Sequence, residues 1–224
     1  AVSLSLDTQI PGTELTVRQK YFKPLIKFPG AIYDDFLISA FGVNLTIETS
    51  DGKIVLQKKR SKFTLTENNK LHVGLGVQLV QHGPDNVDLE QFAYDNLKRQ
   101  YFIKKTETEN LKFYTVAFGS AQCIYGAFGY VKLKFTFDKL YRRLQHSSIG
   151  ERFEIFAMPS NLTGIRNYIT EKRDFIINQY ALFGALTSLQ LFSETSILEI
   201  EEAFSGNIWK DFSLKISENR IEFT

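Results

Sequence analysis

The alternation of apolar and polar residues predicts that strands dominate the first eighty positions. Every second residue from Val43 to Ile47 is apolar, and the Asp51-Gly52 pair that follows is typical of a tight hairpin turn. Residues 53–57 supply the returning strand, and further strands are predicted at 63–66 and 71–80. The pattern predicts an antiparallel meander in which each strand buries one face and leaves the other in water.

Two stretches have the period of a helix instead. Apolar residues at positions 89, 93, 97 and 101 stand four apart, so they share one face of a predicted helix whose N-cap is Asp85 or Asn86. A second helix is predicted from Ile165 to Tyr180, and its continuation to Leu191 is apolar on too many sides to be exposed. These are the two main helices of the predicted fold.

The remaining segments return to the strand pattern. Strands are predicted at 111–118, Val131–Phe137 and 153–157, with a polar loop over 142–150, and then at 197–200 and in a closing hairpin over 212–223. No repeat or long linker divides the chain, so residues 1–224 are predicted to form a single domain with a subdomain seam near position 159. The predicted fold class is α+β, antiparallel and β-rich, with two main helices.

Composition and charge narrow the choice of partners. The 20 Phe and 10 Tyr, against one Trp and one Met, favour strands and adhesive surfaces over helical bundles. The formal net charge of +2 creates no global attraction to nucleic acid or membrane, so any such attraction has to come from local clusters. A homo-oligomer is the expected form of a structural protein with these features.

Cys123 is the single cysteine, so no intramolecular disulfide can form, and a reducing, cytoplasmic or intracellular location is predicted. The longest apolar stretch, residues 180–192, is interrupted by Gly184 and by polar residues, and it is shorter than the roughly 18–20 residues that span a bilayer. No transmembrane segment is therefore expected. Asn44 and Asn161 each begin an acceptor pattern for N-glycosylation whose use the sequence leaves open.

No catalytic or metal-binding motif can be recognised in the sequence. His72, His82 and His146 are scattered without the spacing of a zinc site, and no phosphate-binding loop or nucleophile elbow occurs. Neither a metal nor a cofactor is expected. Cys123 lies in an aromatic, glycine-rich segment, which favours a buried small hydrophobe over an activated nucleophile. The chain is accordingly predicted not to be an enzyme.

Paired carboxylates are the other candidates for acid–base chemistry. Glu199 and Glu201 stand two apart, which is typical of the solvent side of a strand, and Asp34 and Asp35 are adjacent, as in a turn. Both pairs therefore have a structural explanation.

Three short basic clusters are the candidate interaction sites. Positive charge beside aromatic residues suits phosphate-rich partners and anionic lipid, because cations neutralise phosphates while rings stack or insert. Cations also protect strand edges and complement the C-terminal end of a helix dipole, so each cluster has a structural alternative. Whether the clusters share one face is open at this stage. The candidate residues are Lys58, Lys59, Arg60, Lys62, Lys98, Arg99, Lys104, Lys105, Lys139, Arg142 and Arg143.

Several segments together resemble the folded core of rhabdovirus-type matrix proteins. They are Phe41–Gly52, the helix at Val87–Tyr101, residues 111–121, the strand at Val131–Phe137 and a helix ending at Gly184. Residues 54–83 would be an insertion, and no Pro-Pro-x-Tyr motif is present. The resemblance implies a self-associating protein that lines the inner face of a viral envelope, is virion-associated, and contacts lipid or nucleoprotein through its basic clusters.

The leading functional prediction is therefore a non-enzymatic, self-assembling structural protein of viral-matrix type, whose basic and aromatic patches contact a membrane surface or nucleoprotein. One alternative is a nucleic-acid-binding viral coat or movement-type protein. Another is a β-sheet module for carbohydrate or another ligand, with Tyr125, Phe128, Tyr130 and Trp209 as stacking platforms.

Overall fold

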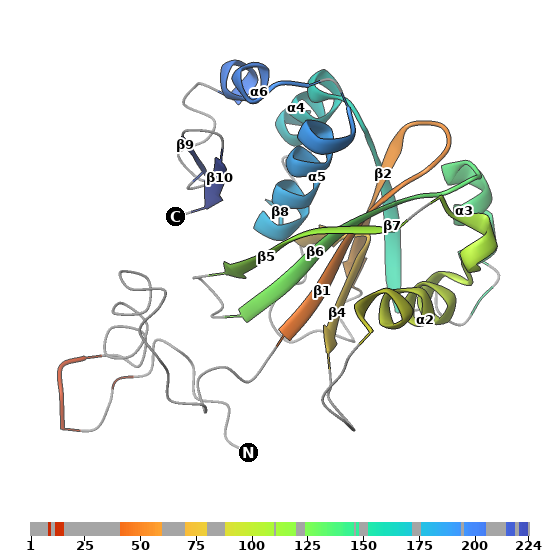
Figure 1. Ribbon diagram of the computed structural model, residues 1–224, viewed down its shortest axis with the longest axis horizontal. Helices are drawn as coiled ribbons and strands as arrows, with labels where there is room; N and C mark the ends of the chain where they lie inside the picture. Colours follow the sequence, from red (N-terminus) through yellow and green to blue (C-terminus); the bar gives the residue numbers. More distant parts are fainter. Residues whose placement is uncertain are drawn as a thin grey trace.

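A mixed sheet lies between two layers of helices (Figure 1). The computed structural model describes residues 9, 12–15, 41–59, 70–79, 88–109, 111–119, 124–145, 147, 152–171, 176–193, 195–204, 214–217 and 220–223. The strands are β1 (Phe41–Glu48), β2 (Lys53–Lys59), β3 (Lys70–Val73), β4 (Leu75–Leu79), β5 (Lys112–Gly119), β6 (Ile124–Lys132), β7 (Phe153–Pro159), β8 (Ile176–Ile177), β9 (Leu214–Ser217) and β10 (Arg220–Phe223). The helices are α2 (Leu89–Tyr101), the short 3-10 helix η4 (Lys105–Glu107), α3 (Phe137–Gln145), α4 (Leu162–Glu171), α5 (Gln179–Phe192) and α6 (Ile197–Phe204). The α+β class predicted from the sequence is confirmed.

The main sheet follows the order β5-β6-β1-β2-β3-β8, with β4 paired to β1 and β7 paired to β2 beside this path. β1 runs parallel to β6 from Phe41 opposite Tyr125 to Glu48 opposite Lys132, and β3 runs parallel to β8. The prediction of an antiparallel sheet is wrong for these two pairs. Alternation along one strand shows which face is buried, but it carries no information about the neighbour that a crossover helix brings alongside.

Helices cover both faces of the sheet. On one face, Val43, Leu45 and Ile47 of β1 belong to a core with Leu97 of α2 and Leu140 of α3. The other face carries a second core, in which β2, β3 and β7 pack with α4, α5 and α6. Figure 1 shows α2 and α3 on one side of the sheet and α4, α5 and α6 on the other. Because both faces are covered, the sheet has no wet side over β1.

Thr46 shows the consequence for a polar position of β1. The alternation predicts that its side chain faces water, but only 3% of Thr46 is exposed. A Cβ atom at Gly184 of α5 would lie 2.6 Å from Thr46 Oγ1, so only glycine allows the helix this approach. The close contact between α5 and β1 buries a residue that the pattern alone assigns to the surface.

Several predicted elements end elsewhere or change type. The predicted strand Val131–Phe137 is half right, because β6 ends at Lys132 and α3 begins at Phe137 and occupies part of the predicted polar loop. The predicted helix Ile165–Tyr180 is divided by β8 into α4 and α5. Residues 197–200 form the start of α6 instead of a strand, because Ser196 N and Oγ donate to Glu199 Oε2 at 2.7 and 2.8 Å, as in a capping box.

Other local predictions are confirmed. The Asp51-Gly52 turn connects β1 and β2, with Gly52 at φ 68, and the closing hairpin appears as β9 and β10. The helix at 89–101 is present, but its N-cap is Asp88, whose Oδ1 accepts from Gln91 N at 3.0 Å, instead of Asp85 or Asn86. The predicted strand 71–80 is two strands that meet at Gly74. The predicted strand at 63–66 lies outside the described residues.

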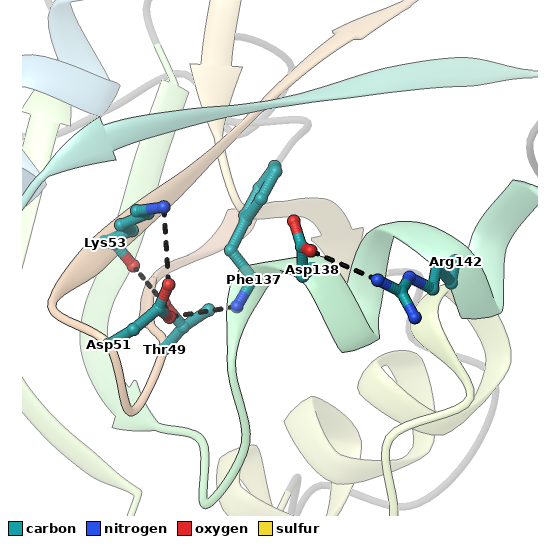
Figure 2. Close-up of polar contacts among 6 residues, drawn as sticks. All are labelled: Thr49, Asp51, Lys53, Phe137, Asp138 and Arg142. Atoms are coloured by element: carbon teal, nitrogen blue, oxygen red, sulfur yellow. Dashed lines mark hydrogen bonds and ion pairs between the residues drawn. The ribbon is translucent and has the colours of Figure 1, made fainter.

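The β1–β2 turn holds the start of α3 (Figure 2). Asp51 Oδ1 accepts from Thr49 Oγ1 at 2.6 Å and from Phe137 N, the first amide of α3, at 2.9 Å. Burial raises the pKa of Asp51, but the hydrogen bonds from Thr49 and Phe137 outweigh it, so the carboxyl pKa lies below its ordinary value. An acceptor from a distant turn therefore caps the first amide of α3, although Thr136 stands directly before Phe137 in the sequence.

Substituting Asp51 by alanine is expected to lower the free energy of unfolding by about 1–2 kcal/mol, the usual cost of losing a side-chain cap. Asp51→Asn keeps an acceptor oxygen in place, so we expect it to retain most of that stability. Urea unfolding followed by circular dichroism compares the two variants. Equal losses in both would show that charge, and not the cap, is the stabilising feature.

Candidate anion-binding face

The C-terminal end of α2 turns sharply at Phe102. This residue has φ 55, in the left-handed region, and its amide donates to Lys98 O at 3.0 Å. The next amide, Ile103 N, reaches back to Leu97 O at 3.3 Å, so the last turn of the helix is closed by the two residues that follow it. The turn leads the chain directly into Lys104 and η4.

Arg143 of α3 is bound to this turn and to η4. Its Nη1 and Nη2 donate to Glu107 Oε2 and Oε1 at 3.0 and 2.8 Å, and Nη1 also donates to Phe102 O at 2.9 Å. The guanidinium lies 4.8 Å from the centre of the Phe135 ring, and Glu107 Oε2 also accepts from Lys104 N. This bidentate pair joins α3 to the α2–η4 segment.

The pairing brings two of the three predicted basic clusters together. Residues 98–105 and 139–143 are separated in sequence, yet the Arg143–Glu107 pair places both on the side of the sheet that α2 and α3 cover. Most of their cations are exposed. We call this surface the α2–α3 face and define it by Lys98, Arg99, Phe102, Lys104, Lys105, Lys139, Arg142 and Arg143.

Several of these cations already have contacts. Lys105 Nζ lies 3.0 Å from Glu90 Oε1 and 4.8 Å from the centre of the Tyr94 ring. Arg142 pairs with Asp138 at 3.4 Å, one helical turn away, and Lys139 Nζ lies 5.4 Å from the Phe135 ring centre. Because Lys105, Arg142 and their partners are largely exposed, these pairs are weak and leave the cations free to rearrange.

The contacts of the α2–α3 face favour the charged forms of Glu107 and Lys105. The hydrogen bond from Arg143 lowers the pKa of Glu107 to about 2, and the Lys104 amide acts in the same direction. The hydrogen bond to Glu90 raises the pKa of Lys105. The seven cations that define the face outnumber the three carboxylates that pair with them, Glu90, Glu107 and Asp138.

The third predicted cluster begins at the end of strand β2 of the sheet. Lys58 is half-buried and Lys59 is exposed at the end of β2, where Lys59 stands opposite Phe153 of β7. The Phe153 ring centre is 5.4 Å from that of Tyr101, the last residue of α2. Arg60 and Lys62 lie outside the described residues.

The predicted stacking platforms are wrong where the structure describes them. Phe128 is 1% exposed and packs edge-on against Phe183 of α5, with ring centres 4.8 Å apart. Tyr130 is also buried and stacks on Phe192 at 4.5 Å. Both rings point into the contact with α5, because that face of β6 is covered by a helix. The side chains of Tyr125 and Trp209 lie outside the described residues.

The other candidates for chemistry give no cluster. Within the described ranges, no group of three His, Cys, Asp or Glu side chains could hold a metal ion. Glu199 caps α6, which accounts for its position, and Asn161 Oδ1 accepts from Gly164 N at 2.8 Å in the first turn of α4. Cys123, His82, His146, Asp34 and Asp35 lie outside the described residues. None of the helices in the described part of the chain is long and apolar enough to span a membrane.

Sequence reasoning missed three residues that organise the α2–α3 face. Glu107 and Phe135 hold Arg143, but they lie 36 and 8 positions away from it and form no motif with it. The left-handed turn at Phe102 could have been suspected from the sequence, since no Gly or Asn follows the apolar stripe that ends at Tyr101. Where neither Gly nor Asn follows a helix, another residue has to adopt the left-handed backbone conformation that ends it.

No protein-family model matches the chain, and no curated protein matches it. Solved structures similar to it include DR0079 from Deinococcus radiodurans, at 12% identity and a TM-score of 0.40, over 64% of this chain and 79% of that one. Another is Tm1382, a candidate Nudix hydrolase, at 14% identity and a TM-score of 0.35, over 68% of this chain and 72% of that one. Both scores are below 0.5, so no activity is carried over from either protein.

These similarities nevertheless correct the leading functional prediction. The prediction of a self-assembling viral-matrix protein, with its coat and carbohydrate-binding alternatives, is set aside, since the solved structures similar to the chain are DR0079 and a candidate Nudix hydrolase. The sequence resemblance to rhabdovirus-type matrix proteins stays a prediction. No family model matches the chain, so nothing supports or contradicts the resemblance. The expectation that the chain is not an enzyme also stays a prediction.

Proposed function

We propose that this domain recognises an anionic ligand or partner through the α2–α3 face. The observation that carries the proposal is the Arg143–Glu107 pair, with its additional hydrogen bond to Phe102 O. It joins two basic clusters that are far apart in sequence. Helix-dipole or strand-edge roles for the separate clusters would not require them to meet. The intracellular location predicted from the single cysteine is part of the same proposal.

The way in which charges are used on this face supports binding. Arg143 has a structural task, since it bonds Glu107 and a backbone carbonyl. Lys98, Lys104 and Lys139 are exposed, and together they create a positive electrostatic potential near the surface. Acidic residues farther away than about 10 Å contribute little to this potential, because salt screens them. Such a potential raises the encounter rate with an anionic partner and stabilises the complex at low salt.

Reversing two exposed cations, in the variant Lys98→Glu with Arg142→Glu, is expected to weaken anion binding about tenfold, which corresponds to about 1.4 kcal/mol. One residue comes from α2 and the other from α3, so the variant tests both clusters at once. Fluorescence anisotropy with a labelled deca-glutamate peptide, at low and at high salt, measures the dissociation constant. The difference is expected to shrink as salt rises, because salt screens exposed charges.

The matched control reverses two exposed cations outside the α2–α3 face, Lys112 of β5 and Arg166 of α4. It changes the net charge by the same amount, so it should bind the peptide nearly as well as the unmodified protein. If both double variants lose affinity equally, net charge alone explains the binding and the proposed face is wrong.

A further inference from the structure

The exposure and the backbone of Phe102 are both unfavourable for the isolated chain. Its φ of 55 lies in the left-handed region, where glycine or asparagine is the usual residue at the end of a helix. Phe102 is also 43% exposed, so a large part of this apolar residue stays in contact with water. The hydrogen bonds of this turn use only the backbone of Phe102, and a glycine would make them equally well.

A bulky residue in the left-handed region costs stability, and residues with such backbone strain cluster at functional sites. Phe102 lies between Lys98 and Lys104 in the chain, and its carbonyl is held by Arg143. The backbone of Phe102 is therefore held by hydrogen bonds at both its amide and its carbonyl, at a position between two cations of the α2–α3 face in the chain. Exposed aromatic residues on a held backbone next to cations resemble the anchors of protein interfaces, where aromatic and Arg residues are enriched.

Carboxylates within the same surface narrow the partner. Glu90, Glu107 and Asp138 lie among the cations, each within 3.4 Å of one of them. A continuous phosphate backbone would have to cross these acidic groups, whereas a protein segment can place carboxylates on the cations and apolar groups on the ring.

We infer that Phe102 is an aromatic anchor for an acidic protein segment that carries an apolar side chain between its carboxylates. This inference rests on the proposed function, and it adds the chemical class of the partner and the residue that selects it. The cations attract the segment and the ring distinguishes it from other polyanions.

Labelled acidic decapeptides that differ only at the central position, which is Gly, Leu, Phe or Trp, test the inference by fluorescence anisotropy. The unmodified protein is expected to bind the Leu, Phe or Trp peptide about tenfold more tightly than the Gly peptide. Phe102→Gly and Phe102→Asn are both compatible with the left-handed turn, so they keep the fold. Both are expected to lose the preference while they retain the affinity for the Gly peptide.

Leu198→Ser is the matched control, because Leu198 is 69% exposed on α6 in the opposite helical layer. It should leave the preference unchanged. If the protein binds all four peptides equally, and Lys98→Glu with Arg142→Glu weakens all of them, the proposed function stands and the role of Phe102 is wrong. If a decathymidylate probe binds more tightly than every peptide, the partner is a nucleic acid and the inference is overturned. If no peptide or decathymidylate binds, the proposed function itself fails.

Discussion

Replacing Tyr101 with alanine is expected to lower the free energy of unfolding by about 3–5 kcal/mol, the range found when a large buried ring is removed. Tyr101 is fully buried at the end of α2, with its ring centre 5.4 Å from that of Phe153. Its hydroxyl donates to the carbonyl of Gly74, between β3 and β4, and lies 3.3 Å from Gln57 Oε1 of β2. Urea unfolding measures the loss of unfolding free energy. It is followed by far-ultraviolet circular dichroism, which reports on the backbone instead of the tyrosine that is removed.

Tyr101→Phe separates the ring from the hydroxyl. This variant keeps the packing but leaves the Gly74 carbonyl and Gln57 without the donor, so we expect a smaller loss of about 1–3 kcal/mol. Burial also raises the pKa of Tyr101 well above its ordinary value, so the hydroxyl stays protonated and remains a donor throughout the usual pH range. A loss as large for phenylalanine as for alanine would contradict the view that packing of the ring is the larger contribution.

Removing the charge of Glu107 is expected to have the second largest effect, about 2 kcal/mol at neutral pH for Glu107→Gln. The pKa of Glu107 falls from 4.5 to about 2, because Arg143 binds the ionised carboxylate. The full shift would correspond to about 3 kcal/mol, and we reduce it because the side chains of Arg143 and Glu107 are 22% and 26% exposed and are partly screened by water.

The depressed pKa sets the direction of the pH dependence. The stabilisation is fully present above about pH 4.5, where the carboxyl is ionised in the folded and the unfolded chain, and it is lost as pH falls toward 2. The unfolding free energy of the unmodified protein should therefore fall over this window more than that of Glu107→Gln.

Glu109→Gln is the control, because Glu109 is exposed two positions away and makes no side-chain contact with Arg143 in the described structure. It should keep the acid dependence of the unmodified protein. Equal acid dependence in the unmodified protein and in Glu107→Gln would show that the Arg143–Glu107 pair contributes nothing to stability.

The local elements could be predicted where the residues that determine them are neighbours in the chain. The Asp51-Gly52 turn needs a residue that tolerates positive φ, and Gly52 adopts φ 68 there. The apolar stripe of α2 follows from the period of the helix, and its buried members include Ala93, Leu97 and Tyr101. The basic clusters were also visible in the sequence, because they are runs of adjacent residues.

The parts that escaped prediction have causes far away in the chain. α3 begins at Phe137 because Asp51, 86 positions earlier, caps its first amide. β1 pairs with β6 in parallel although four strands, β2 to β5, lie between them in sequence. Thr46, on the polar side of β1, is buried because Gly184 lets α5 approach it. None of these contacts leaves a periodic signal.

The candidate site follows the same division. Local periodicity and charge runs are enough to establish the α+β class, the helix that ends at Tyr101 and the cations at 98–105 and 139–143, because each depends on residues within one or two turns of one another. Long-range contacts bring the two clusters onto one face, through Arg143, Glu107 and the carbonyl of Phe102. Such contacts join residues across tens of positions, and their free energy depends on distances that exist only after the chain has folded.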